Sequence, residues 1–268
     1  MQVYKGFDIG TDKIPPEERE NIPHHLLDFI DPSTQFTAAD FVSLALKAIQ
    51  SILKKNRLPL VVGGTGLYLK ALLDGLFPEG RSNPKIRQRL EKEAEEKGLD
   101  SLWKKLEKVD PVYAQKIGKN DRLRIIRALE VFMCTETPLS AHFQKTRSAV
   151  EDFHIVKIGL KLERSELYRK IEDRVDKMFE RGLVEEVRRL QDSGVAEDAP
   201  PFRALGYKHV ISFLKEEINL EEAVLFTKRD TRHYAKRQMT WFRKMQGIRW
   251  FSPREFPKIV QYIEEDLV

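Results

Sequence analysis

The stretch LPLVVGGTGLYLKALLDG, residues 58–75, constrains the fold more than any other part of this sequence. Leu58 to Val62 is a short apolar run that ends at two glycines, and a helical pattern follows it up to Gly75. A strand, a tight glycine turn and a helix make half of a β-α-β unit, and strands of such units are buried on both faces of a parallel sheet. The stretch therefore predicts an α/β fold with a parallel sheet at its core.

Helical patterns flank this stretch and change in character along the chain. Residues 38–53 place apolar side chains at helical spacing, and Thr37 is the expected N-cap. Beyond Asn83 strand-like runs disappear, and charged helical segments such as PKIRQRLEKEAEEKG and NDRLRIIRALEVFM follow one another. The first of these begins at a proline and ends at a glycine, as helices often do. We therefore predict residues 1–82 to be the first part of an α/β core and residues 83–150 to be an all-helical insertion domain.

Residues 151–268 are predicted to return to the core. The segment HIVKIGLKL, residues 154–162, alternates apolar and polar side chains as a strand does. Helices are expected at about 166–181, then up to Ser193, and from Leu220 to about Met245. The predicted architecture is a parallel-sheet core with a helical insertion and basic helices near the C-terminus.

The composition excludes several classes of protein. The chain of 268 residues is 41% hydrophobic and 33% charged, and it offers no apolar run of the ~18 residues that a membrane span needs. The N-terminus lacks the basic and apolar regions of a signal peptide. The single cysteine, Cys134, allows neither an internal disulfide nor a cysteine zinc cluster. We expect a cytoplasmic protein without a membrane partner, without a protein-bound metal centre, and monomeric.

Positive charge is concentrated in the last predicted helix. The formal net charge is only +5, but Arg229, Arg232, Lys236 and Arg243 follow one another in steps of three, four and seven and so share one helical face. Aromatic side chains at Tyr234, Trp241 and Phe242 are interleaved with them, which suits packing or stacking on bases. A solvated basic face is the alternative. The pattern favours nucleic acid as a partner.

Other motifs are weak when they are taken one at a time. The turn VVGGTG exposes backbone N–H groups at a helix start, which suits phosphate, but a purely structural turn is equally compatible with it. Arg124 and Arg127 share a helical face, and a solvated face is the commoner reason for such a pair. The adjacent His24 and His25 point to opposite sides of an extended segment, so we predict no metal site there.

Taken in order, however, seven segments together resemble one family. They are MQVYKGFDIGT, IPHHLLDFIDP, FTAADF, LPLVVGGTGLYLKALLDGL, NDRLRIIRALEV, FRALGY and YAKRQMTWFRK. In this order they resemble the tRNA dimethylallyltransferases, also called tRNA isopentenyltransferases, from Met1 to about Trp250. The resemblance implies transfer of a dimethylallyl group from dimethylallyl diphosphate to the exocyclic amine of adenosine 37, just 3′ of the tRNA anticodon. It also implies a fold like that of P-loop kinases, an insertion that grips the anticodon stem-loop, a flipped base, and Mg²⁺ accompanying the diphosphate.

The resemblance assigns expected roles to individual residues. Arg174, in KIEDRVDKM, matches an active-site arginine whose guanidinium neutralises charge on the departing diphosphate. Thr65, in GGTGLY, is expected at the active site in contact with the target nucleotide. The residues expected to contact tRNA are Gln2, Thr65, Arg87, Leu123, Arg124, Ile125, Ile126, Arg127, Arg203, Ala204, Leu205, Gly206, Tyr207, Lys208, Lys236, Arg237, Gln238, Met239, Thr240, Trp241, Phe242 and Arg243.

One motif of the family does not occur in these residues. The pattern G-x-x-x-x-G-K-[ST] is absent, although the family carries such a P-loop on its first strand. The family also carries a proton-accepting aspartate in an Asp-Ser-x-Gln segment of which Gln2 is the last residue. Both features are expected before Met1, so this chain by itself is expected to be catalytically deficient.

Two alternatives to a prenyltransferase remain open at this stage. A tRNA-binding protein without catalysis, as a fragment or a decayed copy, would bind an anticodon stem-loop in a salt-dependent manner without turnover. A small-molecule nucleotide kinase shares the fold class, but the basic aromatic helix and the absent P-loop disfavour it.

Overall fold

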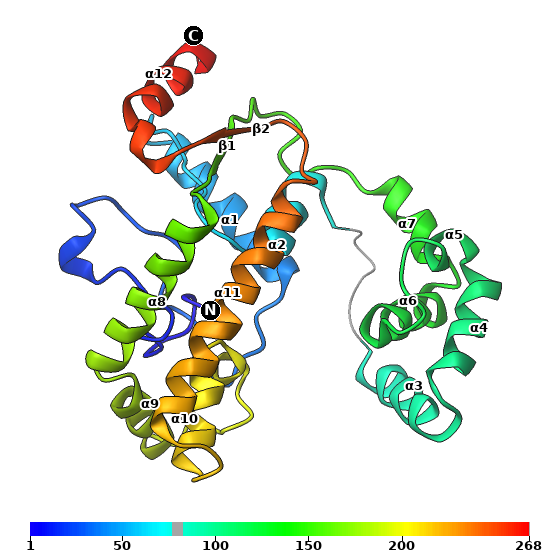
Figure 1. Ribbon diagram of the computed structural model, residues 1–268. Helices are drawn as coiled ribbons and strands as arrows, with labels where there is room; N and C mark the ends of the chain where they lie inside the picture. The colour runs from blue at the N-terminus through cyan, green and yellow to red at the C-terminus, as the bar shows by residue number, and fades with distance from the viewer. Residues whose placement is uncertain (77–82, 268) are drawn as a thin grey trace. The chain divides into compact units, whose positions relative to one another are not determined.

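The computed structural model describes residues 1–76 and 83–267. The chain divides into two compact units, one made of Met1–Tyr68 with His154–Val268 and the other of Leu69–Phe153 (Figure 1). The segment predicted as a helical insertion, residues 83–150, lies inside the second unit. No helix in the described part of the chain is long and apolar enough to cross a membrane.

The first unit contains most of the helices and both strands. Its elements are α1 (Ala38–Leu53), the start of α2 (Gly66–Asp74), β1 (Lys157–Leu160), α8 (Arg164–Glu180), α9 (Leu183–Asp192), α10 (Tyr207–Leu214), α11 (Leu220–Phe242), β2 (Ile248–Phe251) and α12 (Phe256–Leu267), with short 3-10 turns at Pro16–Glu18, Pro200–Arg203 and Pro253–Glu255. Local signals set several of these bounds. Thr37 and Asn219 form capping boxes at the starts of α1 and α11, and Gly75 ends α2 at a φ of +86°.

The core of the first unit lies between α8, α9 and α10. Phe7 and Phe202 pack edge to face with ring centroids 5.1 Å apart, and Tyr207 lies against both rings. Burial of such aromatic side chains contributes a large share of the apolar stabilisation of a small core. Helices α8 and α11 lie side by side, so the N-terminal loop, α8 and α11 are held in one body (Figure 1).

The observed sheet is smaller than the sequence predicts. Strand β1 falls within the predicted segment 154–162 and pairs in parallel with β2, with Lys157 opposite Ile248 and Leu160 opposite Phe251. The described part of the chain is therefore helix-rich α/β with a two-stranded parallel sheet. The further likeness to P-loop kinases stays a prediction.

The strand predicted at Leu58–Val62 is wrong for this structure. The backbone there forms neither a strand nor a helix, and the side chains of Leu60 and Val62 are 75% and 82% exposed. A strand exists only when a neighbouring strand accepts and donates its hydrogen bonds. Among residues 1–76 and 83–267 no strand pairs with this segment. The apolar composition alone therefore did not make this segment a buried strand in the structure.

The second unit is helical throughout its described part. Its elements are the rest of α2, then α3 (Pro84–Lys97), α4 (Leu99–Val109), α5 (Pro111–Ala114), α6 (Arg122–Thr135) and α7 (Leu139–Lys145). Asn83 caps α3 by accepting from the N–H groups of Lys85 and Ile86, with Pro84 at the first helical position. Helices α3, α4 and α6 enclose a core that includes Leu102, Leu106 and Ile125.

Candidate functional site

The glycine turn before α2 packs against the C-terminal end of α11. The side chain of Gln238 donates a hydrogen bond from Nε2 to the carbonyl oxygen of Gly64, at 2.9 Å. The indole of Trp241 lies so close to Gly66 that a Cβ on this residue would be 2.4 Å from Cδ1 and Nε1. Thr65, between these two contacts, is exposed. The structure thus brings together Thr65 and the segment 236–243, which are far apart in the sequence.

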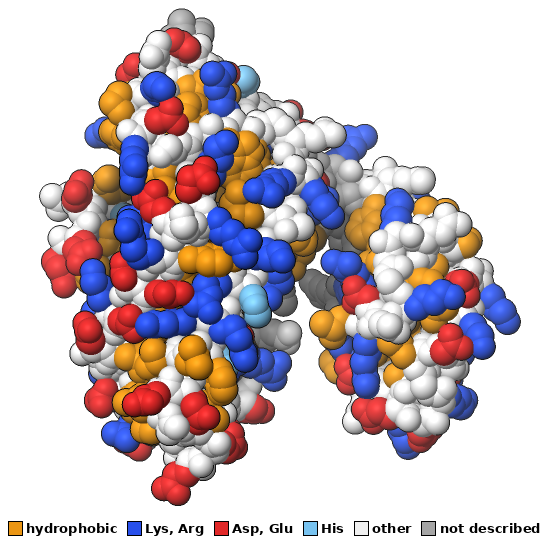
Figure 2. Space-filling model, in the orientation of Figure 1, with side chains coloured by type: hydrophobic (Ala, Val, Ile, Leu, Met, Phe, Trp, Pro, Cys, Tyr) orange, Lys and Arg blue, Asp and Glu red, His pale blue; other side chains and the backbone are white. Residues whose placement is uncertain are grey.

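The end of α11 also carries the unpaired part of the basic stripe. Within the described residues no carboxylate lies within ion-pair distance of Lys236, Arg237 or Arg243, all of which are exposed. The guanidinium of Arg237 lies over the ring of Tyr234, 5.8 Å from its centroid. Lys and Arg side chains gather over α11 on the face that Figure 2 shows. This end of the helix therefore presents positive charge and aromatic surface beside Thr65.

The other half of the predicted stripe is neutralised within the fold. Arg232 forms an ion pair with Glu172 of α8, and Arg229 pairs with Asp230 at 3.0 Å. Asp230 also accepts from Lys208 at 2.7 Å. The helical spacing puts these cations on one face, but ion pairs neutralise Arg229 and Arg232. Lys236 and Arg243 have no carboxylate partner among the described residues.

Asp230 links α11 to the predicted tRNA-binding segment 203–208. Although burial alone would raise its pKa, hydrogen bonds from Lys208 and Arg229 hold the pKa of Asp230 well below its usual value. Burial and the nearby charge of Lys208 lower the pKa of His209, whose ring also lies 3.1 Å from Asp230. The cluster therefore holds a fixed carboxylate charge between the two helices.

Within the segment 203–208 the side chains divide between surface and core. Arg203 and Lys208 are exposed, whereas Ala204 and Leu205 are half-buried. Tyr207 is fully buried, and Gly206 is buried beside it. Burial and the neighbouring Glu186 carboxylate raise the pKa of Tyr207, so its hydroxyl stays protonated and donates to Glu186. The Tyr207 side chain is therefore not at the surface, and contact of the segment 203–208 with tRNA stays a prediction.

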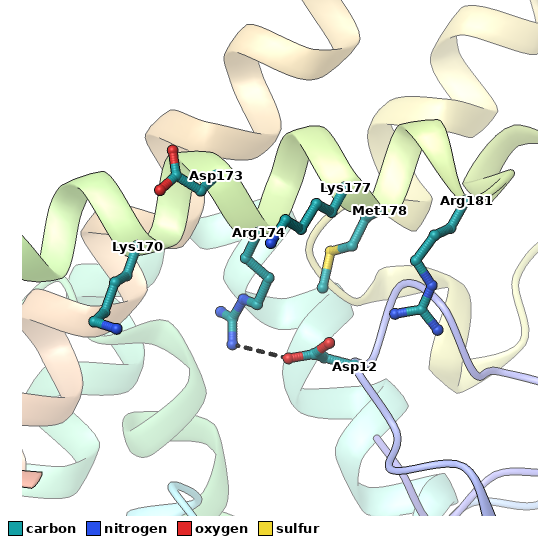
Figure 3. A pocket seen from close by; sticks show the side chains of 7 residues that line it. All are labelled: Asp12, Lys170, Asp173, Arg174, Lys177, Met178 and Arg181. Carbon is teal, nitrogen blue, oxygen red and sulfur yellow. Dashed lines mark ion pairs between the residues drawn. The ribbon is translucent and has the colours of Figure 1, made fainter. Parts of the chain in front are cut away.

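Arg174 lies on a concave basic surface of α8. Its Nη1 is 3.5 Å from Oδ2 of Asp12, and its side chain is 45% exposed. Figure 3 shows Lys170, Arg174, Lys177 and Arg181 projecting from the same helix, with Arg174 directed at the loop of Asp12. The complete lining is Asp12, Lys170, Asp173, Arg174, Lys177, Met178 and Arg181.

Among these lining residues only Arg174 was expected from the sequence. The steps of four, three and four between the four basic residues would have revealed the rest, because such spacing places side chains on one helical face. With four cationic and two anionic side chains, this surface suits an anionic ligand.

Gln2 is joined to the same region by the N-terminal loop. Its Nε2 donates to the carbonyl oxygens of Thr11, at 3.0 Å, and of Asp12, at 2.9 Å. Both Gln2, a predicted tRNA contact, and Arg174, a predicted active-site residue, therefore contact Asp12, the first at its backbone carbonyl and the second at its carboxylate.

In the second unit the predicted contacts are partly core residues. Leu123 and Arg124 are exposed on α6, but Ile125 and Ile126 are buried in the core of the unit. The period of the helix turns these two side chains inward, and contact of the segment 123–127 with tRNA stays a prediction. Arg127 pairs with the buried Glu130 at 2.7 Å. On α3, Arg87 pairs with Glu91 at 3.3 Å.

The remaining predicted positions lie on α11 around the contact with the turn. Met239 and Phe242 are half-buried, and Thr240 is exposed and donates its hydroxyl to the carbonyl of Lys236 at 2.9 Å. In the described residues no group of three or more His, Cys, Asp or Glu side chains is arranged to hold a metal ion.

The family pattern and the similar proteins all belong to one family. The sequence pattern of the family described as IPP transferase matches residues 2–245. The tRNA dimethylallyltransferase of Carboxydothermus hydrogenoformans is 45% identical over 253 residues, which cover 94% of this chain and 81% of that protein. The tRNA dimethylallyltransferase of Geobacter metallireducens is 45% identical over 264 residues, covering 98% of this chain and 85% of its own.

Solved structures agree with these relatives. The full-length tRNA isopentenylpyrophosphate transferase from Bacillus halodurans superposes with a TM-score of 0.70 at 40% identity, covering 99% of this chain and 85% of that one. A eukaryotic dimethylallyltransferase acting on tRNA superposes with a TM-score of 0.80 at 31% identity, covering 94% of this chain and 65% of that one. Because the family pattern matches residues 2–245 and the relatives are similar over nearly the whole chain, this chain belongs to the IPP transferase family, the family of the tRNA dimethylallyltransferases.

Proposed function

We propose that this protein transfers a dimethylallyl group from dimethylallyl diphosphate to the exocyclic amine of adenosine 37 in tRNA, giving isopentenyladenosine. Family membership supports the reaction class. The structural observation that carries the proposal is the contact of the Thr65 turn with the end of α11, where Lys236, Arg237 and Arg243 have no carboxylate partner among the described residues. A nucleotide bound at Thr65 would have cations and aromatic rings beside it for its backbone and its flanking bases.

The recognition chemistry follows from the side chains at this end of α11. Exposed cations bind phosphates of the anticodon stem-loop and make the affinity depend on salt. Trp241 and Tyr234 offer ring faces on which unstacked loop bases can stack. Chemistry on a base requires its removal from the stack, and Thr65 lies at an exposed turn within reach of such a flipped base.

The departing diphosphate needs positive charge, and α8 supplies it. The adenine amine is a poor nucleophile, so the allylic carbon must lose diphosphate as the new carbon–nitrogen bond forms, and the amine gives up one proton to a base or to water. Arg174 can donate hydrogen bonds to two oxygens at once, while Lys177 and Arg181 add charge on the same surface. In the free protein Arg174 pairs with the exposed Asp12 carboxylate at 3.5 Å, and the incoming diphosphate displaces this contact.

Mg²⁺ is proposed to accompany the diphosphate as part of the substrate. When bound, the ion neutralises charge on the diphosphate oxygens. The described residues present no ready-made cage of three carboxylate, histidine or cysteine ligands. Mg²⁺ commonly keeps phosphate oxygens and water as ligands, so the ion would enter together with the diphosphate.

The test uses the protein purified from the cells that naturally produce it. Wild-type protein, dimethylallyl diphosphate, Mg²⁺ and unmodified tRNA are incubated, and the tRNA is digested to nucleosides for mass spectrometry. We expect isopentenyladenosine, and about a hundredfold or greater loss of rate for Arg174→Ala, the size seen when one charge-stabilising donor is removed. Arg188→Ala, an exposed arginine on α9, is the matched control and should retain the rate. Binding of tRNA without product would contradict the proposal.

A further inference from the structure

A buried carboxylate in α9 holds the N-terminal loop by its backbone. Glu186 is only 1% exposed. Its Oε2 accepts from the N–H groups of Asp8, at 3.1 Å, and Ile9, at 2.8 Å. Its Oε1 accepts from the N–H group of Gly10, at 3.3 Å, and from the Tyr207 hydroxyl, at 2.6 Å. Three successive N–H groups and one hydroxyl thus converge on a single carboxylate.

This arrangement is unusual for a buried charge. Removal of a carboxylate from water costs several kcal/mol unless partners replace the lost hydration. In the described residues Glu186 has no Lys, Arg or His within ion-pair distance, so its four hydrogen bonds supply that replacement. Successive backbone N–H groups that face one anion form a concave nest, and here the anion is a side chain of the same protein.

Close packing leaves the backbone of the loop little room to shift at Gly10. A Cβ at Gly10 would lie 2.5 Å from the Tyr207 ring and 2.8 Å from the Leu183 side chain, so only glycine lets the backbone approach. The loop continues with Asp12 N–H donating to Ile9 at 3.1 Å and with the Lys13 N–H donating to Asp8 at 3.0 Å. Residues 11 and 12 therefore follow rigidly from residues 8–10.

The loop that follows residues 8–10 contacts both Gln2 and Arg174. Gln2 Nε2 donates to the carbonyls of Thr11 and Asp12, and the Asp12 carboxylate is 3.5 Å from Arg174. Glu186 touches neither Gln2 nor Arg174 in any recorded hydrogen bond or ion pair of the described residues. Its influence on both must pass through the loop.

We propose that Glu186, with Tyr207, is a positioning residue for the dimethylallyl transfer. Its carboxylate fixes the backbone of residues 8–10, and residues 11 and 12 in turn position Gln2 for contact with tRNA. The same loop places the Asp12 carboxylate beside Arg174. The inference rests on the proposed function, because Gln2 and Arg174 matter only if the chain binds tRNA and transfers the prenyl group. It also explains why a tyrosine in the segment 203–208 points inward.

The test begins with steady-state kinetics of the natively expressed protein. Wild-type product formation is measured first, and its absence would defeat the proposed function without bearing on Glu186. Glu186→Gln keeps the side-chain size but replaces one acceptor oxygen by an NH₂ group, which cannot accept from the loop N–H groups. Glu185→Gln, at the exposed neighbouring position, is the control and should keep the wild-type rate.

In Glu186→Gln protein shown to be folded by circular dichroism at the assay temperature, the KM for tRNA should rise about tenfold or more. Gln2→Ala should act in the same direction, and the double variant should be no worse than the more impaired single variant, because both changes remove one interaction. Wild-type kinetics for folded Glu186→Gln, or effects of Gln2→Ala and Glu186→Gln that multiply, would overturn the inference. If Glu186→Gln does not fold, Tyr207→Phe carries the same test, since it removes a single donor.

Discussion

The contact between Gly66 and Trp241 can be disturbed by a single methyl group. In Gly66→Ala the added Cβ would lie 2.4 Å from Cδ1 and Nε1 of the indole, whereas ordinary contacts begin near 3.4 Å. The ring must therefore move by about 1 Å, away from the turn that carries Thr65. An aromatic ring held in a helix adjusts less easily than the end of a long flexible side chain. Gly63→Ala is the matched control, because nothing lies within 4 Å of a Cβ there.

The expected size of the effect follows from two opposing terms. Overpacking of this kind costs about 1–3 kcal/mol. Alanine at a helical position gains up to about 1 kcal/mol over glycine. The difference is about 0–3 kcal/mol, with a middle value of about 1–2 kcal/mol. If tRNA binds only the original Trp241 arrangement, that middle value corresponds to a roughly 5- to 30-fold weaker affinity for tRNA.

Fluorescence anisotropy with a labelled anticodon stem-loop, at one fixed salt concentration, measures that affinity. Gly63→Ala should bind as wild type does, and Gly66→Ala should bind more weakly. In a Trp241→Ala background the effect of Gly66→Ala should disappear, because the clash is then gone. Equal binding by Gly63→Ala and Gly66→Ala, or an undiminished effect of Gly66→Ala without the indole, would refute the reasoning.

Three further predictions concern charge. Lys236→Ala should lower the slope of log affinity for tRNA against log salt by about one, whereas Arg232→Ala, whose guanidinium pairs with Glu172, should leave the slope near wild type. Asp12→Asn should tighten inorganic diphosphate binding in calorimetry by up to about fivefold, because it frees Arg174 from an exposed ion pair; unchanged affinity would show that Asp12 does not compete. The hydrogen bond from Lys13 lowers the pKa of Asp28 against the opposing effect of burial, so its stabilisation is present above the unfolded pKa of about 3.9 and is lost as the pH falls through the lower folded pKa. The urea midpoints of Asp28→Asn and wild type should therefore differ at pH 7, and the difference should shrink as the pH falls below about 3.9. A difference that stays constant with pH would exclude the Lys13 contact as the cause.

Helix ends could be read from the sequence because their signals are local. Thr37 before α1, Pro84 at the start of α3 and Gly75 after α2 each act on backbone groups within one turn. The strand predicted at residues 58–62 failed for the opposite reason. Whether an apolar run pairs as a strand depends on a partner elsewhere in the chain, and the partner of β1, Ile248–Phe251, was likewise not predicted.

The site shows the same division between local and tertiary information. The helical spacing of Arg229, Arg232 and Lys236 is confirmed by α11, and Arg243 is the residue that caps the end of this helix. Which of these cations are free depends partly on Asp230, the neighbour of Arg229 within α11, and partly on acids in other elements, such as Glu172 on α8, which no pattern within α11 reveals. Glu186 was missed because a carboxylate that binds backbone N–H groups far away in the sequence has no spacing of its own.

Hydrogen exchange of the protein with and without an anticodon stem-loop tests most directly whether the Thr65 turn and the end of α11 form one tRNA site. The backbone amides of residues 63–68 and of residues 236–243 should gain protection together, at the same RNA concentration, and should gain less with a stem-loop that has guanosine in place of adenosine 37. Protection confined to one of the two segments, or equal protection by both stem-loops, would contradict a joint site for the target adenosine.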